Sequence, residues 1–344
     1  MVRVFSCPRK ANMALYYQDE HVTLYHGDSL EILPTLDIQA DALLTDPPYF
    51  KVKNEPWDNQ WKKPDEFLKW LGDFLDTAKP LIAANGSVWV FASPKMSARV
   101  ELLVGERFNV LNNIRWWKPN GGTARRVSMP TMRSFASVWE SIIFAEQYCD
   151  SYEDMSTATA RKVFAPLGDY LRGKWESAGW RGGELGIALG RDSALPTRWA
   201  EGSSIPSEGD YQKMKELIGG RWKEHSEIRA WRDDLRREFE HLRRPFSVDS
   251  IPLKEDIWRF NLVGYYPGKH PCEKPQDMLQ HMIRTTTREG DTVLDPFAGS
   301  GSTLIAAKAL GRKSVGIEMN EQYCEQIATR LTQQPEQLAF EFTA

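Results

Sequence analysis

The chain has 344 residues, of which 41% are hydrophobic and 26% charged, with a formal net charge of −3 at pH 7. These values are typical of a folded chain of about two domains and exclude a disordered or collagen-like one, and no apolar run approaches the roughly 18 residues of a membrane span. Four cysteines, Cys7, Cys149, Cys272 and Cys324, stand far apart, which favours a reducing cytoplasm over a disulfide framework or a zinc site.

The first 150 residues alternate strand-like and helix-like segments. Residues 41–46 form a short apolar run that ends in two prolines, and residues 87–93 and 110–117 are further β-rich runs. Between the first two runs, apolar residues from Phe67 to Leu75 recur at helical spacing and predict a helix that buries one face. This alternation predicts an α/β domain with a mostly parallel sheet.

The pattern changes between residues 151 and 246, where short helices and polar loops are predicted. Residues 222–244 carry many charges with apolar residues at helical spacing, which predicts an amphipathic helix packed on a neighbour. From residue 291 the α/β pattern returns, with Gly311 closing one helix and Asn320 starting the next. The chain is therefore predicted to form one α/β domain, residues 1–150 and 247–344, interrupted by a helical module, residues 151–246.

A glycine loop from Asp295 to Thr303 lies between a predicted strand and a predicted helix. Glycines let backbone amides approach a ligand closely, and the start of a helix contributes positive partial charge. Glu318 ends the next predicted strand, where a carboxylate can accept hydrogen bonds from both hydroxyls of a ribose. These features predict a nucleoside cofactor, either NAD or S-adenosylmethionine. The third glycine of the dinucleotide motif is absent, and Asp295 suits a charged amino-acid tail better than a pyrophosphate.

A second motif, Thr45-Asp46-Pro47-Pro48-Tyr49, follows the first predicted strand. The exocyclic amine of a nucleobase is a poor nucleophile because its lone pair is delocalised into the ring. The carboxylate of Asp46 and the carbonyl of Pro47 can each accept one N–H and so localise that lone pair. The prolines hold these acceptors ready, and Tyr49 can stack on a base taken out of the double helix. The alternative interpretation is an ordinary strand-ending turn.

In this order the two motifs resemble those of the amino-methyltransferases of DNA, in their permuted β group, which form N6-methyladenine or N4-methylcytosine. The resemblance covers most of residues 15–149 and 250–332. Asp28, in His26-Gly-Asp28, matches an aspartate that contacts the adenine end of the cofactor, and His270-Pro-Cys-Glu-Lys274-Pro275 resembles an HPTxKP signature that helps enclose the methionine end. Cys272 stands where Thr is usual and is interpreted as structural.

The resemblance implies a doubly wound, mostly parallel, Rossmann-like methyltransferase sheet and transfer of a methyl group from S-adenosylmethionine to the N6 amine of adenine in double-stranded DNA, on a flipped base. Asp before Pro-Pro-Tyr favours adenine; the alternatives are N4-cytosine methylation and a catalytically inactive DNA-binding regulator. No metal is implied. Catalysis is assigned to Asp46, Pro47, Pro48 and Tyr49, and cofactor binding to Asp28, His270, Lys274, Asp295, Phe297, Gly299, Gly301, Ser302, Thr303 and Glu318.

Two regions are candidates for DNA contact. Between Glu106 and Glu140 there is no acidic residue but there are six basic ones, and Lys118, Arg125 and Arg126 are expected to contact phosphates. The inserted module supplies the second region. This module is interpreted as the target-recognition domain, the part of the protein that reads the DNA sequence to be methylated.

Residues 167–219 of that module resemble a Cro/repressor-type helix-turn-helix domain. Leu185, Leu189 and Trp199 are expected in its core, Gly190 at the end of the first helix and Ser193 as the cap of the second, with Arg191, Thr197 and Arg198 facing a DNA groove. The alternative is a helical insertion that only braces the catalytic domain. The protein is expected in the cytoplasm, in a bacterium or encoded by a phage; a homodimer and a cognate restriction nuclease are left open.

Overall fold

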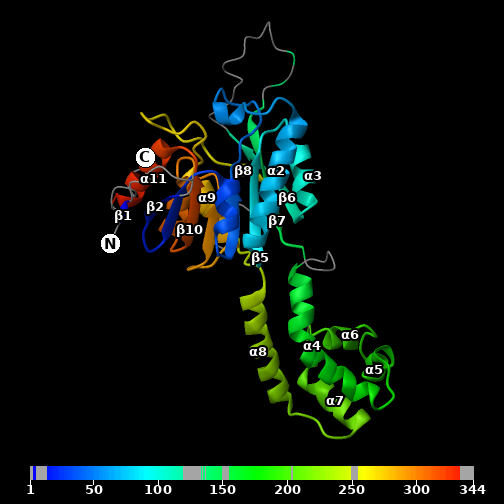
Figure 1. Ribbon diagram of the computed structural model, residues 1–344. Helices are drawn as coiled ribbons and strands as arrows, with labels where there is room; N and C mark the ends of the chain where they lie inside the picture. The colour runs from blue at the N-terminus through cyan, green and yellow to red at the C-terminus, as the bar shows by residue number, and fades with distance from the viewer. Residues whose placement is uncertain are drawn as a thin grey trace. The chain divides into compact units, whose positions relative to one another are not determined.

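The computed structural model describes residues 3–4, 14–118, 133, 135, 137–148, 155–202, 204–248 and 255–333. The chain divides into two compact units, one formed by Met1–Tyr148 with Pro245–Ala344 and the other by Cys149–Arg244 (Figure 1). Within the described residues, no helix is long and apolar enough to cross a lipid bilayer.

The first unit contains, in its described part, a ten-stranded sheet of order β1-β2-β3-β10-β9-β4-β5-β7-β6-β8. Neighbours from β3 to β5 pair in parallel, whereas β7 is antiparallel to both β5 and β6. The predicted mostly parallel sheet is confirmed at its centre. The strands are β1 (Arg3–Val4), β2 (Ala14–Gln18), β3 (Val22–His26), β4 (Ala40–Thr45), β5 (Ile82–Ala92), β6 (Asn109–Trp117), β7 (Trp139–Glu146), β8 (Ile257–Arg259), β9 (Thr292–Asp295) and β10 (Lys313–Glu318).

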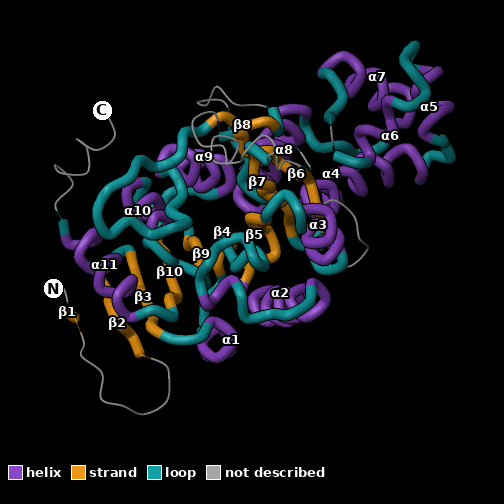
Figure 2. The backbone as a smooth tube through the Cα atoms, turned by 90° about the horizontal axis from the view of Figure 1, so that it is seen from above, coloured by secondary structure: helices purple, strands orange, loops and turns teal. Residues whose placement is uncertain are grey.

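Helices cover both faces of this sheet, as a doubly wound fold requires (Figure 2). Side chains of a strand alternate between its faces, so Val88 and Val90 of β5 share a core with α2 and α3, whereas Trp89 and Phe91 share another with α9. The sheet is thus buried on both sides, which explains its apolar central strands. The helices are α1 (Ser29–Ile32), α2 (Pro64–Ala78), α3 (Ser97–Gly105), α9 (Gln276–Thr286), α10 (Ser302–Ala309) and α11 (Glu321–Thr332).

Two predicted helix boundaries of this unit are confirmed. Gly311, with φ +69°, follows the last residues of α10 in the left-handed conformation that ends many helices. The side chain of Asn320 accepts a hydrogen bond from the backbone N–H of Gln322 and caps α11. Both boundaries are set by local chemistry, which explains why the sequence was sufficient to place them.

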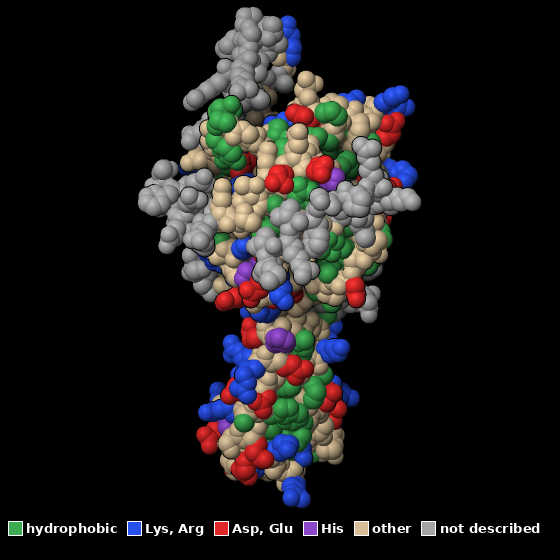
Figure 3. All heavy atoms as spheres, turned by 60° about the vertical axis from the view of Figure 1, so that its left-hand side comes forward, with side chains coloured by type: hydrophobic (Ala, Val, Ile, Leu, Met, Phe, Trp, Pro, Cys, Tyr) green, Lys and Arg blue, Asp and Glu red, His purple; other side chains and the backbone are tan. Residues whose placement is uncertain are grey.

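The second unit is helical, with α4 (Met155–Glu176), α5 (Gly182–Ala188), α6 (Leu195–Ala200), α7 (Glu208–Ile218) and α8 (His225–Leu242). It has its own hydrophobic core, in which α4 packs against α6 and α8. The predicted amphipathic helix is α8, which buries Ile228 and Leu235 in that core. On the face seen in Figure 3, the Lys and Arg side chains of this unit are interspersed with Asp and Glu.

The α5 and α6 helices follow one another across a short turn in which Gly190 has a φ of +71°. Leu185, Leu189 and Trp199 are buried in the core of the unit. The prediction that Ser193 caps α6 is wrong: the helix starts one residue later, after Ala194, whose backbone N–H is bound by the side chain of Asp192. No side chain caps the start of α6, since the Asp192 carboxylate binds the N–H of Ala194, the residue before the helix.

Candidate active site

A cavity of about 960 Å³ opens at the carboxyl ends of the central strands of the first unit. Its lining comes from the segments that follow β3, β4, β9 and β10 and from the segment that leads into α9 (Gln276–Thr286). From β9 the chain continues through α10 to β10, which lies beside β9. From β4 it continues through α2 to β5, which lies beside β4 on the side away from β9. The neighbours β9 and β4 thus lie where the strand order reverses, which is the usual ligand site of an open α/β sheet.

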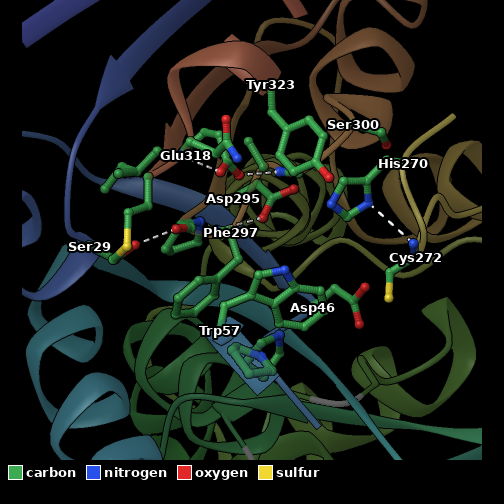
Figure 4. Close-up of a pocket in the computed structure, with 18 of the residues that line it drawn as sticks. Ser29, Asp46, Trp57, His270, Cys272, Asp295, Phe297, Ser300, Glu318 and Tyr323 are labelled. Carbon is green, nitrogen blue, oxygen red and sulfur yellow. Dashed lines mark hydrogen bonds between the residues drawn. The ribbon is translucent and has the colours of Figure 1, made fainter. Parts of the chain in front are cut away.

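The predicted catalytic and cofactor-binding residues converge on this one cavity. Every one of them lines it except Gly301, which immediately precedes α10. In Figure 4, Asp295, Glu318 and His270 lie toward one end of the drawn group, and Asp46 and Trp57 toward the other. The cavity therefore joins the glycine loop to the Asp46 turn, two segments that are far apart in the sequence.

The glycine loop requires both of its glycines. Gly299 and Gly301 have φ values of +52° and +74°, in the left-handed region that side chains disfavour. A Cβ atom at Gly301 would lie 2.8 Å from the side chain of Ile327, and one at Gly299 would lie 3.1 Å from the ring of His270. A larger residue at either position would therefore force the loop away from α11 or from the His270 segment.

Glu318 ties the end of β10 to this loop. Its two carboxylate oxygens accept hydrogen bonds from the backbone N–H groups of Gly299, at 2.8 Å, and Asn320, at 2.7 Å. Burial raises the pKa of Glu318 to about 6. Each oxygen keeps a further lone pair, so the carboxylate can still accept hydrogen bonds from a ligand in the cavity.

Asp295 is a buried carboxylate at the end of β9, with 3% of its surface exposed. It is hydrogen-bonded to the backbone N–H of Phe297 at 3.2 Å and to the side chain of Thr303. Burial raises its pKa to about 7, and the nearby charges that act on it, Asp46 and Glu318, are also acidic. A cationic ligand group beside Asp295 would supply the missing counter-charge.

The other predicted cofactor residues form the walls of the cavity. The ring of His270 packs edge-on against Tyr323 at 4.5 Å, and burial lowers its pKa to about 4, so the ring is neutral at pH 7. Phe297 packs on the aromatic side chains of α2. Asp28 caps α1 by accepting the N–H of Leu30 and lines the cavity with the rest of its carboxylate.

The carboxylate of Asp46 has one paired and one open oxygen. Its Oδ2 lies 2.5 Å from the ammonium nitrogen of Lys274, whereas Oδ1 is buried and has no hydrogen-bond partner among the described residues. Burial raises the pKa of Asp46, and the charge of Lys274 opposes that rise. An unpaired buried acceptor is costly, so Oδ1 is suited to receive a donor from outside the protein.

Tyr49 is held in place from both ends. Its hydroxyl donates to Glu140 Oε2 at 3.1 Å and accepts from Lys274 Nζ at 3.1 Å. Its backbone N–H donates to Asp58 Oδ1 at 2.6 Å. The ring lines the cavity although only 8% of the residue is exposed, so a base could stack on it only from inside the cavity.

Asp58 is a site residue that the sequence reasoning missed. It is fully buried and accepts three backbone N–H groups, from Tyr49, Val52 and Lys53, each at 2.6 Å. Phe50 and Lys51, between these donors, have φ values of 67° and 59°, which is strained for residues with side chains. The sequence marks the position only as Pro56-Trp57-Asp58, an unremarkable turn, so no local signal identified it.

Glu140 was also missed, although a charged residue within the apolar run of β7 was a signal for it. Cys272, in contrast, behaves as interpreted: burial raises its pKa to about 11, so the thiol is protonated at neutral pH and is a poor nucleophile.

Of the predicted DNA contacts, Lys118 is placed differently from the expectation. Its side chain is only 14% exposed, and its ammonium group forms an ion pair with Glu140. The charge that a phosphate would need is already neutralised, so we withdraw Lys118 as a phosphate contact. Arg125 and Arg126 lie outside the described residues. In the helical unit, Arg191 binds Asp210 at 3.0 Å, whereas Thr197 and Arg198 are exposed on α6.

Comparison with known proteins places the chain in a family. A profile described as DNA methylase matches residues 40–329. The type II methyltransferase M2.DpnII of Streptococcus pneumoniae is 26% identical over 338 residues, covering 92% of this chain and 91% of that protein. The DNA adenine methyltransferase YhdJ of Escherichia coli (strain K12) is 23% identical over 320 residues, covering 92% and 84%.

Solved structures share the fold. The PvuII DNA methyltransferase, described as cytosine-N4-specific, superposes with a TM-score of 0.52 at 14% identity, covering 94% of this chain and 91% of that one. The complex of M1.HpyAVI with S-adenosylmethionine gives a TM-score of 0.50 at 19% identity, covering 91% and 100%.

The chain belongs to the N6/N4 family of DNA methylases. It is a DNA methyltransferase whose cofactor is S-adenosylmethionine. The cavity fits that cofactor, since Asp295 lacks the positive counter-charge that an amino-acid ammonium would provide, and the glycine loop leaves room for close approach.

Proposed function

We propose that this DNA methyltransferase methylates the N6 amine of adenine in double-stranded DNA, on a base turned out of the duplex. The observation that carries the proposal is that Asp46 lines the same cavity as the glycine loop and has a buried Oδ1 with no hydrogen-bond partner among the described residues. The Asp46 side chain is largely buried within this cavity, so we infer that an amine inside an intact base pair cannot approach it. The base must therefore leave the helical stack before it can bind.

The Asp46 turn is suited to activate an amine. Oδ1 of Asp46 accepts one N–H and the carbonyl of Pro47 accepts the other, which draws the lone pair of the nitrogen out of the ring. S-adenosylmethionine supplies a methyl group on a positively charged sulfur. Burial raises the pKa of Asp46, so its Oδ1 can take the proton that the methylated amine must release. The ring of Tyr49 stacks on the base meanwhile.

The cofactor-binding roles follow from the positions of the side chains. We assign Glu318 to the ribose hydroxyls, Asp295 to the ammonium of the methionine end, and Asp28 to the adenine end. Gly299, which lines the cavity, lets the backbone approach the cofactor, and Gly301 keeps the loop close to α11. The remaining wall residues are His270, Phe297, Ser302 and Thr303. Lys274 acts instead on Asp46, to which it is bound.

The helical unit, Cys149–Arg244, is proposed as the target-recognition domain. This proposal is supported by the two consecutive short helices α5 and α6. Both bury side chains in the same core, and α6 exposes Thr197 and Arg198. In a helix-turn-helix the second of two such helices enters the major groove. A unit that only braces the catalytic domain would leave the recognised sequence unchanged when these exposed residues are replaced.

The product distinguishes the proposal from its alternatives. DNA incubated with the enzyme and cofactor is hydrolysed to nucleosides and analysed by mass spectrometry. We expect N6-methyladenine, and we expect Asp46→Ala to reduce the rate at least about a hundredfold, as for a lost transition-state contact, while cofactor affinity by calorimetry stays near wild type. N4-methylcytosine as the product would overturn the adenine assignment. If the protein bound DNA tightly but formed no methylated base, an inactive DNA-binding regulator would be favoured.

A further inference from the structure

Glu140 lies on β7 between two lysines and beside Tyr49. Its Oε1 forms an ion pair with Lys118, and its Oε2 is 3.6 Å from Nζ of Lys274 and 3.1 Å from the hydroxyl of Tyr49. Its side chain is only 17% exposed. Glu140 therefore contacts two of the groups that hold the Asp46 turn, without lining the cavity itself.

Both lysines are fixed by their surroundings. The ammonium of Lys118 lies over the ring of Trp116 at 4.6 Å, and its backbone N–H donates to Val138 at 2.8 Å, next to the start of β7. The ammonium of Lys274 lies over the rings of Phe91, at 4.7 Å, and Tyr49. Their positive charges are thus confined to short distances from Glu140.

The four charged groups alternate in sign: Asp46, Lys274, Glu140 and Lys118. Buried charges are tolerated when each is paired, and removing one member leaves its neighbour uncompensated. Such a row also transmits a change of charge, because each group shifts the ionisation of the next. The state of Asp46 thus depends on groups that do not touch the substrate.

We propose that Glu140, with Lys118 as its counter-charge, is a positioning residue for methyl transfer. It holds the ammonium of Lys274 between two carboxylates and fixes the hydroxyl of Tyr49, so that Asp46 keeps Oδ2 paired and Oδ1 open. This inference rests on the assignment of Asp46 to the target amine. The Asp46→Ala variant tests that assignment separately, so a failure of the assignment can be distinguished from a failure of this inference.

The proposal predicts opposite effects from two substitutions. Glu140→Gln removes a negative charge, which leaves Asp46 facing more positive charge and makes it more acidic. Lys118→Met removes a positive charge and leaves Glu140 uncompensated, which makes Asp46 less acidic. The titratable or charged groups that act on this row or respond to it include Asp46, Tyr49, Lys53, Lys118, Glu140, His270, Cys272, Lys274 and Asp295.

The experiment measures both kcat and kcat/KM for DNA against pH with the intact enzyme at saturating S-adenosylmethionine. We expect Glu140→Gln to lower kcat about tenfold, as for a lost hydrogen bond to a charged group, and to move the acidic limb to lower pH. Lys118→Met should move that limb to higher pH. The double variant restores the balance of charge and should return the limb close to its wild-type position.

Glu146→Gln is the matched control, because Glu146 is a buried glutamate at the opposite end of β7, bound to Asn109. It should leave the acidic limb in place. Cofactor affinity measured by calorimetry checks that each variant is folded. The proposal would be overturned if the acidic limbs of the pH profiles of Glu140→Gln and Lys118→Met moved in the same direction, or if neither limb moved. If Glu140→Gln fails to fold, Lys118→Met and the double variant still decide it.

Discussion

The ammonium nitrogen of Lys274 lies 2.5 Å from Oδ2 of Asp46, although 228 residues separate them in the chain. This ion pair joins the segment after β4 to the segment before α9. It also gives a buried carboxylate a counter-charge that opposes the rise of its pKa caused by burial, and in the proposed mechanism an ionised Asp46 is the form that accepts an amine N–H. The pair is therefore a tertiary contact between distant segments and, in the proposed mechanism, a condition for catalysis.

Replacing Lys274 by Met should damage activity in a way that alkaline pH partly repairs. Without the ammonium, the pKa of Asp46 rises further, so more of the enzyme is protonated at neutral pH and the acidic limb of the pH–rate profile moves up. The rate should recover as the pH rises through the new pKa. A rate loss of equal size at every pH would show that Lys274 acts in some other way.

The same variant should lose stability, by about 3 kcal/mol at pH 7, because it leaves a buried charge unpaired. The loss should shrink as the pH falls through the raised pKa of Asp46, since a protonated carboxyl needs no counter-charge. Urea unfolding at several pH values measures this. The exposed pair Lys69–Asp73, at 2.6 Å, provides the control, and Lys69→Met should cost little.

Affinity for S-adenosylmethionine should depend on pH through Asp295. Burial raises the pKa of the carboxyl to about 7 in the free protein, and an ammonium bound beside it lowers that pKa. Binding therefore releases a proton, and affinity should fall as the pH drops below 7, by up to about tenfold per pH unit. Calorimetry between pH 5.5 and 8.5 measures the slope.

Asp295→Asn is the control for this effect. It should bind the cofactor more weakly than wild type at pH 8 and should lose the dependence on pH near 7. Glu318, whose pKa burial raises to about 6, would then account for any weaker dependence that remains at lower pH. A variant with the wild-type slope near pH 7 would remove Asp295 from the methionine end.

Asp58→Ala should reduce kcat strongly while changing cofactor affinity little. The substitution leaves the N–H groups of Tyr49, Val52 and Lys53 without their acceptor, so the strained residues Phe50 and Lys51 can relax and move Tyr49. We expect a loss of about 3 kcal/mol in the free energy of unfolding. Asp58→Asn keeps one acceptor oxygen, so its kcat and its free energy of unfolding should lie between those of the wild type and of Asp58→Ala. Unchanged kcat in a folded Asp58→Ala enzyme would contradict the role.

Substitutions at candidate DNA contacts should separate reading from affinity. Arg198→Ala, on the exposed side of α6, should relax the preference at one target position, since a good base contact contributes about 1–3 kcal/mol of discrimination. Arg125→Ala and Arg126→Ala should weaken binding to all sequences and flatten its salt dependence. Methylation of a randomised DNA pool compares the three. A wild-type preference in Arg198→Ala would favour a bracing role for the helical unit.

Local signals in the sequence were sufficient for the elements and for the two ends of the site. The periodicity of residues 67–75 predicted α2, Asn320 and Gly311 marked helix boundaries, and the Asp46 turn and the glycine loop each identified a ligand-facing segment. These signals work because capping, turn geometry and amphipathic spacing are properties of neighbouring residues. The predicted cap of α6 failed because the helix begins one residue later than a Ser193 cap requires, after Ala194, where no side chain forms a capping hydrogen bond.

The side-chain partners were decided only by the tertiary structure. Lys118 was expected to face phosphate, but β6 and β7 bring it beside Glu140, and the ion pair removes its charge from the surface. Lys274, which is predicted to bind the cofactor, lines the cavity and also binds Asp46, a partner that the sequence did not indicate. The sequence around Asp58 gave no sign of the backbone N–H groups that this side chain holds. A charge finds its partner through whichever strands the sheet places side by side, and at the centre of a doubly wound sheet those strands come from distant parts of the chain.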